Sequence, residues 1–212
     1  MIDYSKFLNN SIQEIKPSGI RKFFDIASEM DDVISLSIGE PDFQTPWHIR
    51  EEGINSLKNG KTWYSPNRGF AQLREEIANY YARRFNISYE GKTQVLVTVG
   101  GSEAIDLAFR CLVSEGDEVI IPEPSFVCYE PLTHMAGGKA VIINTKAEDQ
   151  FRLKADDLEK AITDKTKLVV LPFPNNPTGA IMEKADLEAI AEVIKKHDLF
   201  VLSDEIYCEL TY

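Results

Sequence analysis

Hydrophobic residues from about position 94 onward follow two alternating patterns. Short runs rich in β-branched residues predict strands, and the segments between them place hydrophobic residues every three or four positions, as an amphipathic helix does. The expected strands are Gln94–Val99, Glu118–Pro122, Lys139–Ile143, Lys167–Pro172 and Leu199–Ser203. Strands and helices that alternate in this way are typical of βαβ units and predict an α/β fold with a parallel sheet.

Two of the intervening helices have boundaries that the sequence indicates. Ser102 is a candidate N-cap for a helix that ends near Gly116, and Glu183–His197 predicts a second helix with the same hydrophobic spacing. The hydrophobic positions of the two helices are Ile105, Ala108, Phe109, Leu112, Leu187, Ile190, Ala191 and Ile194. Each helix is therefore expected to cover a face of the sheet.

The first 93 residues predict mostly helix and loop. Thr45 and Pro46 are a capping residue followed by a proline at the first helical position, and Asn59-Gly60 is a signal for the end of that helix. A second helix is marked by Phe70, Leu73, Ile77 and Tyr80. We interpret the segment before about residue 40 as an arm or a piece of another domain.

Composition narrows the class of protein. The 212 residues carry a net charge of −11 and no block of Lys and Arg, which disfavours nucleic acid as a partner. The longest apolar runs are far shorter than the ~20 residues of a membrane span, and the N-terminus has no apolar signal core. Three scattered cysteines without a CxxC pair indicate reduced thiols, and three scattered histidines disfavour a zinc site. A cytoplasmic protein without membrane contact is expected.

Three loops that follow predicted strands carry candidate chemistry. Ligands of parallel α/β sheets bind at the carboxyl ends of strands, so these loops are expected to converge. The first, VTVGGSEAI, offers bare backbone N–H groups and the Ser102 hydroxyl to a phosphate at the positive end of a helix dipole. A tight strand-to-helix turn with a serine cap explains the same residues equally well. The loop matches neither GxGxxG nor GxxxxGK[ST], which disfavours a dinucleotide or a nucleoside triphosphate.

The other two loops carry an amide, a carboxylate and a phenol. In FPNNPTG, Pro177 favours an extended backbone at Asn176, so this loop either aims the Asn176 amide or is simply stiffened by its prolines. In FVLSDEIYCEL, Asp204 follows a nearly all-apolar strand, where a carboxylate is costly unless a cation or a strong donor meets it. Tyr207 lies three residues further on. The structural alternatives are a helix N-cap for Asp204 and a packed aromatic ring for Tyr207.

Six motifs occur in an order that resembles the class I and II aminotransferases, which are pyridoxal-phosphate enzymes of fold type I. They are SIGEPDF, YSPNRGFAQLREEIA, TVGGSEAI, EPSFVCY, NNPTG and SDEIY. Each is weak alone, but the ordered set is specific and spreads over most of the chain. The resemblance implies a three-layer αβα large domain with an incomplete, mostly parallel sheet. Residues 45–212 would be the N-terminal part of this cofactor-binding domain, whose C-terminal half is absent, and residues 1–44 an N-terminal arm and small-domain segment.

The resemblance also implies a site for pyridoxal phosphate. Asp204 would pair with the pyridine nitrogen and keep it protonated, so that the ring can act as an electron sink. Asn176 and Tyr207 would donate hydrogen bonds to the 3-oxygen of the ring. Phe126 would stack on the ring, with Tyr129 as the second candidate, and a core aromatic is the structural alternative for Phe126.

The same resemblance implies positions for the phosphate and the substrate. The phosphate cradle would consist of Gly100, Gly101, Ser102 and Glu103. Gly39 and Asn176 would bind the substrate, with a plain turn as the alternative for Gly39. Tyr64 would reach the cofactor phosphate of the neighbouring subunit, which implies a homodimer. Cis peptide bonds are expected at Glu123–Pro124 and Asn176–Pro177, and no metal is expected.

The implied reaction transfers an amino group from an L-amino acid to a 2-oxo acid. The lysine that forms the Schiff base is expected beyond Tyr212, so no catalytic residue is assigned here and these 212 residues alone are expected to be inactive. Two alternatives remain. One is a pyridoxal-phosphate-dependent carbon–sulfur β-lyase on the same scaffold, and the other is a noncatalytic aminotransferase-like binding module.

Overall fold

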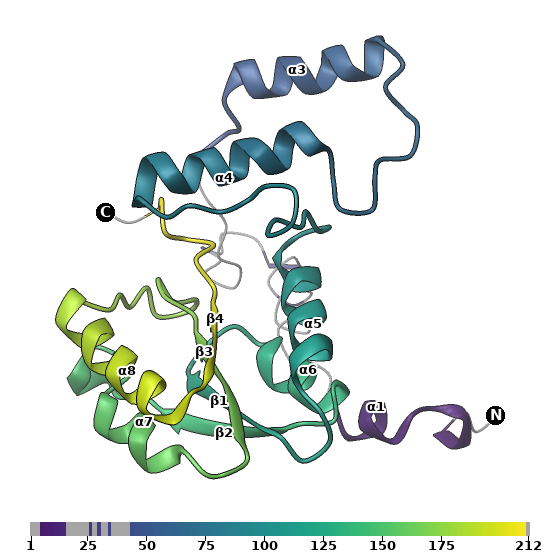
Figure 1. The fold of residues 1–212 in the computed structure, drawn as a ribbon. Helices are drawn as coiled ribbons and strands as arrows, with labels where there is room; N and C mark the ends of the chain where they lie inside the picture. The colour runs from purple at the N-terminus through teal and green to yellow at the C-terminus, as the bar shows by residue number, and fades with distance from the viewer. Residues whose placement is uncertain (1–4, 16–25, 27–28, 31–33, 35–42, 211–212) are drawn as a thin grey trace. The chain divides into compact units, whose positions relative to one another are not determined.

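The computed structural model describes residues 5–15, 26, 29–30, 34 and 43–210. The chain divides into two compact units, one formed by Met1–Glu40 with Ile105–Tyr212 and the other by Pro41–Ala104. The first unit contains a four-stranded sheet between helices (Figure 1). The predicted domain boundary between residues 44 and 45 stays a prediction.

The sheet of the first unit is parallel throughout, with the strand order β2-β1-β3-β4. Its strands are β1 (Glu118–Glu123), β2 (Lys139–Asn144), β3 (Thr166–Leu171) and β4 (Phe200–Ser203). Each predicted strand end in this region differs from the observed end by at most one residue. The predicted α/β class with a parallel sheet is confirmed.

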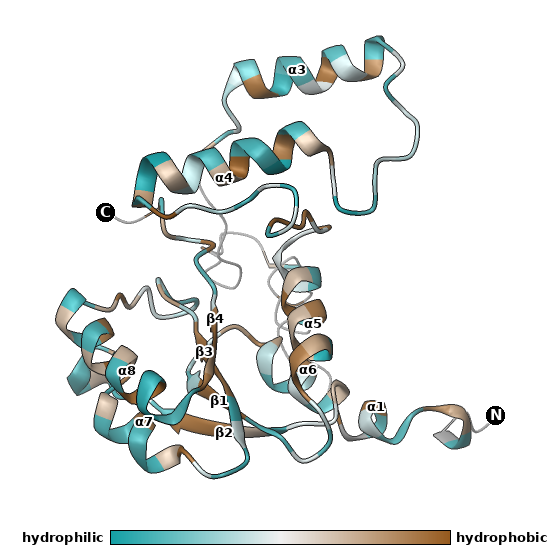
Figure 2. Cartoon of the chain, viewed as in Figure 1, coloured by the Kyte–Doolittle hydropathy of each residue, from teal (hydrophilic) through white to brown (hydrophobic). Residues whose placement is uncertain are grey.

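Each face of the sheet has its own hydrophobic core, because successive strand residues point to opposite faces. Val119 and Ile121 pack on one face with Phe109, whereas Ile120 packs on the other with Ile190. The four helices that cover the sheet are α5 (Gly101–Leu112) and α6 (Tyr129–Met135) on the first face, and α7 (Ala155–Ala161) and α8 (Lys184–His197) on the second (Figure 1). Figure 2 shows hydrophobic residues concentrated along the strands, as expected for a sheet that is covered on both faces.

Shorter elements complete the first unit. The N-terminal α1 (Asn10–Glu14) is capped by the side chain of Asn9, which accepts a hydrogen bond from the Ser11 backbone N–H at 3.0 Å. Two 3₁₀ turns are formed by Ser5–Phe7 and Ala147–Asp149. The start of α8 has a capping box, in which Glu183 and Asp186 bind each other's backbone N–H groups. Glu183 is therefore the N-cap, and α8 begins at Lys184, one residue later than the sequence predicts.

The second unit contains α3 (Trp47–Lys58) and α4 (Ala71–Phe85), whose residue ranges agree closely with the two helices that the sequence predicts. Helix α3 begins one residue later than expected, because Pro46 occupies the N-cap position and no side chain caps the helix. Helix α4 ends in an aromatic cluster of Tyr80, Tyr81, Phe85 and Tyr89.

The predicted strand Gln94–Val99 is wrong. The segment is not a strand in the structure, and its Val97 N–H donates to the carbonyl oxygen of Arg68 at 3.2 Å rather than to a neighbouring strand. A β-branched run becomes a strand only where another strand completes its hydrogen bonds. None of the described strands pairs with this segment.

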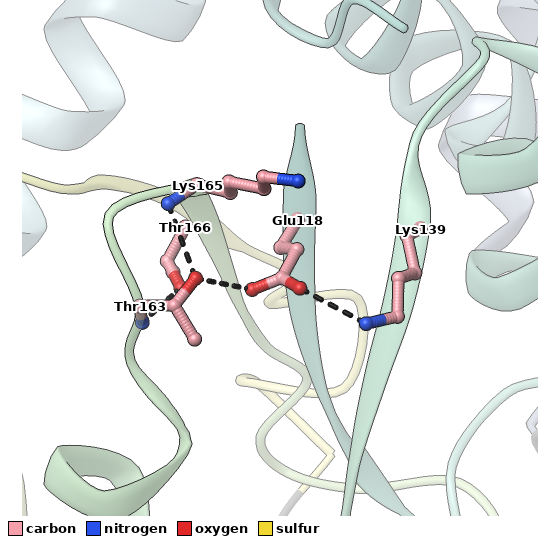
Figure 3. A network of polar contacts seen from close by, with 5 residues as sticks. All are labelled: Glu118, Lys139, Thr163, Lys165 and Thr166. Carbon is pink, nitrogen blue, oxygen red and sulfur yellow. Dashed lines mark hydrogen bonds and ion pairs between the residues drawn. The ribbon is translucent and has the colours of Figure 1, made fainter. Parts of the chain in front are cut away.

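A polar network joins the amino ends of the strands. Glu118, the first residue of β1, is only 6% exposed, and its carboxylate accepts hydrogen bonds from Thr163 Oγ1 at 2.6 Å and from Lys139 Nζ at 3.0 Å (Figure 3). Thr163 Oγ1 also accepts from the Lys165 backbone N–H at 3.1 Å, and the Thr163 N–H donates to Thr166 Oγ1 at 2.9 Å. The network therefore connects β1, β2 and the turn that precedes β3.

Candidate functional site

Three loops of the first unit begin at the carboxyl ends of β1, β3 and β4. Because these strands are parallel neighbours in the sheet, their carboxyl ends lie at the same edge. The loops carry the candidate residues Phe126, Asn176, Asp204 and Tyr207. This edge is where parallel α/β sheets bind their ligands.

Asp204 is held in place by three hydrogen bonds. Its backbone N–H donates to the carbonyl oxygen of Leu171 at 3.0 Å, which extends the pairing of β4 with β3 by one residue. Its Oδ2 accepts a hydrogen bond from the Tyr129 hydroxyl at 2.7 Å, and its Oδ1 accepts from the Ile206 backbone N–H at 3.2 Å. Each carboxylate oxygen thus has one donor among the described residues and retains capacity to accept another.

Tyr129 is a donor to Asp204 rather than a stacking residue. Its side chain is 1% exposed and belongs to the core on the α5 and α6 side of the sheet, so its ring face is not available to a ligand. Burial, followed by the hydrogen bond to Asp204, raises the pKa of the Tyr129 phenol far above its ordinary value. The phenol therefore stays protonated and donates.

Phe126 is the aromatic residue that remains accessible in the same loop. It is 38% exposed, and its ring meets that of Tyr129 edge-on, with 6.2 Å between the centroids and 82° between the planes. This contact steadies one edge of the Phe126 ring. Of the two aromatic residues considered for stacking, only Phe126 offers an exposed ring.

The loop after β3 is organised by Asn175, which the sequence argument missed. Asn175 is 6% exposed, and its Oδ1 accepts from Thr178 Oγ1 at 3.0 Å and from the Thr178 N–H at 3.4 Å. Its backbone N–H donates to the carbonyl oxygen of Ala180 at 2.9 Å, and its carbonyl oxygen accepts from the Gly179 N–H at 2.8 Å. The signal for this closed loop was the Asn-Asn-Pro-Thr-Gly order itself, in which either asparagine can accept from a nearby N–H.

Asn176 differs from its neighbour. Its side chain is half-buried, and no described residue forms a hydrogen bond with its amide. The peptide bonds Glu123–Pro124 and Asn176–Pro177 are both cis, as predicted, and Phe173–Pro174 is a third cis bond that was not predicted. The Asn175 side chain therefore stabilises its own loop through hydrogen bonds, whereas the Asn176 amide is available for a ligand.

Two further residues of this edge bear on its chemistry. Tyr207 is half-buried in the turn after Asp204, and its backbone carbonyl oxygen accepts from the Leu210 N–H at 2.9 Å. Cys128, which the sequence argument left unassigned, has its pKa raised to about 12 by burial and then by the negative charge of Asp204. Its thiol is therefore neutral at physiological pH.

The second unit contains the predicted phosphate cradle, at the start of α5. Gly100 has φ +84°, in the left-handed region, and its carbonyl oxygen accepts from Thr98 Oγ1 at 2.9 Å. The helix begins at Gly101, so Ser102 lies inside the first turn and is not the predicted N-cap. The Glu103 carboxylate instead accepts a hydrogen bond from the Val99 N–H. The Ser102 side chain is exposed, and the first turn of the helix is the type of terminus that attracts anions.

Two of the predicted residues lie away from these loops in the sequence. Tyr64 is described and fully exposed, at 101%. Gly39 lies outside the described residues. Over the described part of the chain, the side chains of His, Cys, Asp and Glu form no group of three that could hold a metal ion. The helices described here are also too short or too polar to cross a membrane.

Comparisons with known proteins agree on one family. The family model described as "Aminotransferase class I and II" matches residues 31–212. The putative aminotransferase YugH of Bacillus subtilis is 51% identical over 208 residues, which are 98% of this chain and 54% of the relative. Aromatic-amino-acid aminotransferase 2 of Thermococcus litoralis is 44% identical over 97% of this chain and 53% of its own length.

Solved structures give the same result. The aspartate aminotransferase of Rhizobium meliloti matches with a TM-score of 0.91 and 34% sequence identity, over 97% of this chain and 52% of the other. The structure titled Pyrococcus protein-A1 matches with a TM-score of 0.89 and 46% identity, over 93% of this chain and 51% of the other. The chain thus spans about half the length of the relatives that it matches.

Proposed function

Because this chain belongs to the class I and II aminotransferase family, we propose that it forms part of an aminotransferase that moves an amino group from an L-amino acid to a 2-oxo acid. Enzymes of this family use pyridoxal phosphate, which when bound supplies an electron sink for the bonds at the α-carbon of the amino acid. The observation that carries the proposal is that a hydrogen-bonded carboxylate and an amide without a partner among the described residues lie at the same edge of the sheet. Asp204 and Asn176 follow the adjacent parallel strands β4 and β3, and so lie at one edge of the sheet.

The donors and acceptors at this edge fit the cofactor ring. Asp204 would accept a hydrogen bond from the protonated pyridine nitrogen with the capacity that its two oxygens retain. The Asn176 amide, which has no partner among the described residues, and the Tyr207 phenol would donate to the 3-oxygen. The exposed Phe126 ring would stack on the face of the pyridine ring. Asn176 would also contact the substrate.

The second unit would bind the phosphate and the partner subunit. The cradle consists of Gly100, Gly101, Ser102 and Glu103, through backbone N–H groups and the exposed serine hydroxyl. The full exposure of Tyr64 supports its proposed reach to the phosphate of a neighbouring subunit, and hence a homodimer. Helix α3 buries none of its side chains and exposes Trp47 and Leu57, which also supports an interface there. The backbone of Gly39, which has no side chain, would approach the substrate carboxylate closely.

The test uses the protein encoded by the complete reading frame. We expect the purified protein to bind pyridoxal phosphate and to transaminate an L-amino acid with 2-oxoglutarate. Asp204→Asn should weaken cofactor binding and lower kcat by at least about 100-fold, because the neutral amide no longer keeps the pyridine nitrogen protonated. Asp198→Asn is the matched control, since Asp198 is an exposed residue that ends α8 and asparagine tolerates its left-handed backbone.

The outcomes separate the candidate functions. Pyruvate release from cystathionine without transamination would favour the carbon–sulfur β-lyase. Cofactor or amino-acid binding without turnover would favour the binding module. Failure of the full-length protein to bind pyridoxal phosphate at all would refute the proposed function.

A further inference from the structure

The Tyr129 hydroxyl meets Asp204 although the two residues are 75 positions apart in the sequence. Tyr129 opens α6 after β1, and Asp204 follows β4, so the 2.7 Å hydrogen bond joins two segments of the site that no local pattern connects. Among the described residues, the Tyr129 hydroxyl is the side-chain group that donates to the Asp204 carboxylate. The second donor to this carboxylate is the Ile206 backbone N–H.

Tyr129 is held by a hydrogen bond at its backbone and by the packing of its ring. Its backbone carbonyl oxygen accepts a hydrogen bond from the hydroxyl of Thr133 at 2.8 Å, and Thr133 is fully buried. Its ring packs in the core with Phe109 and Val119, and its side chain is 1% exposed. A donor that is fixed at its backbone and its ring can hold the carboxylate in one orientation.

We propose that Tyr129 is a positioning residue for Asp204. Its hydroxyl fixes the plane of the carboxylate, so that the oxygens turn their remaining acceptor positions toward the pyridine nitrogen of pyridoxal phosphate. This inference rests on the proposed function, and it assigns Tyr129 a role through Asp204 rather than a contact with the cofactor.

The role requires the phenol to remain protonated while it donates. Burial and the contact with Asp204 raise the pKa of Tyr129, so the hydroxyl keeps its proton at physiological pH. The neighbouring Cys128 thiol is also neutral, since its pKa is raised to about 12. Asp204 is therefore next to two neutral groups.

The test is a double-mutant cycle in the full-length protein, with Tyr129→Phe, Asp204→Asn and both together. Dissociation constants for pyridoxal phosphate are measured by the quenching of tryptophan fluorescence. Tyr129→Phe should weaken binding about tenfold, as expected for the loss of one hydrogen bond to a charged group. In the Asp204→Asn background the same change should weaken binding less than about twofold, because the carboxylate that it serves is gone. Tyr89→Phe, at an exposed tyrosine, is the control and should leave binding unchanged.

A second ligand separates positioning from general damage to the fold. In the analogue of pyridoxal phosphate whose pyridine nitrogen is replaced by carbon, no nitrogen pairs with Asp204. Tyr129→Phe should bind this analogue as the unsubstituted protein does, within about twofold. Equal losses for both ligands, or additive effects of the two substitutions, would overturn the inference. If the unsubstituted protein binds neither ligand, the proposed function fails instead, and the two failures are thus distinguishable.

Discussion

Replacing Thr163 by valine should destabilise the first unit more than replacing Lys139 by methionine, although each change removes one partner of Glu118. The Thr163 hydroxyl donates to a nearly buried carboxylate at 2.6 Å, and a hydrogen bond to a charged group contributes about 1.5–3 kcal/mol. The same hydroxyl accepts from the Lys165 N–H, which valine cannot replace. We therefore expect a loss of about 2–3 kcal/mol for Thr163→Val.

The Lys139 side chain is 70% exposed, so solvent screens its ion pair with Glu118. Exposed pairs contribute about 0–1 kcal/mol, and Lys139→Met should lower the free energy of unfolding by no more than this. Urea unfolding at pH 7, followed by circular dichroism, measures both changes. An equal or larger effect of Lys139→Met would refute the reasoning that the buried hydroxyl contact outweighs the exposed ion pair.

The same network predicts a dependence on pH. The hydrogen bonds from Thr163 and then Lys139 lower the pKa of the Glu118 carboxyl in the folded protein. Because the folded-state pKa lies below the unfolded value of about 4.3, this stabilisation is fully present above that value and is lost as the pH falls through the folded pKa. Glu118→Gln should therefore lose less stability between pH 6 and pH 3 than the unsubstituted protein. Identical slopes would contradict the assignment.

Two further predictions concern single side chains. The Cys128 thiol should resist iodoacetamide at pH 8, because burial and then a nearby carboxylate raise its pKa to about 12. The exposed Cys111 should react under the same conditions, and both thiols should react in urea. Equal reaction rates of the two thiols in the folded protein would contradict this prediction. Gly138→Ala should destabilise by about 1–3 kcal/mol, because its Cβ would lie 2.5 Å from Val113 Cγ1. Gly53→Ala, in the open surroundings of α3, should be neutral or stabilise by up to about 1 kcal/mol, and equal unfolding midpoints for the two variants would refute the steric argument.

The sheet could be predicted from local patterns wherever each strand has a neighbour to pair with. The runs at Glu118–Pro122 and Lys167–Pro172 are hydrophobic on both faces, as a covered parallel sheet requires, and both became strands with ends shifted by at most one residue. The run at Gln94–Val99 has similar composition and is not a strand. Its hydrogen bonds depend on a partner strand, and the composition of a segment does not provide one.

The kinds of side chain at the candidate site, a carboxylate and an amide, could also be predicted from the sequence. A carboxylate directly after an apolar strand at Asp204, and an asparagine before a proline at Asn176, are unusual enough to be selected by local reasoning. Such features depend on neighbours in the sequence, which is why the loops could be chosen without a structure.

Only the tertiary structure determined which side chains form hydrogen bonds with each other and which are buried. It placed the Tyr129 hydroxyl on Asp204, enclosed the ring of this second candidate for stacking, and left the ring of Phe126, the first candidate, exposed. It also separated Asn175, which closes its own loop, from Asn176, whose amide has no partner among the described residues. Burial and partner choice depend on strand order and on packing between distant segments, and these are properties of the folded chain that no local pattern contains.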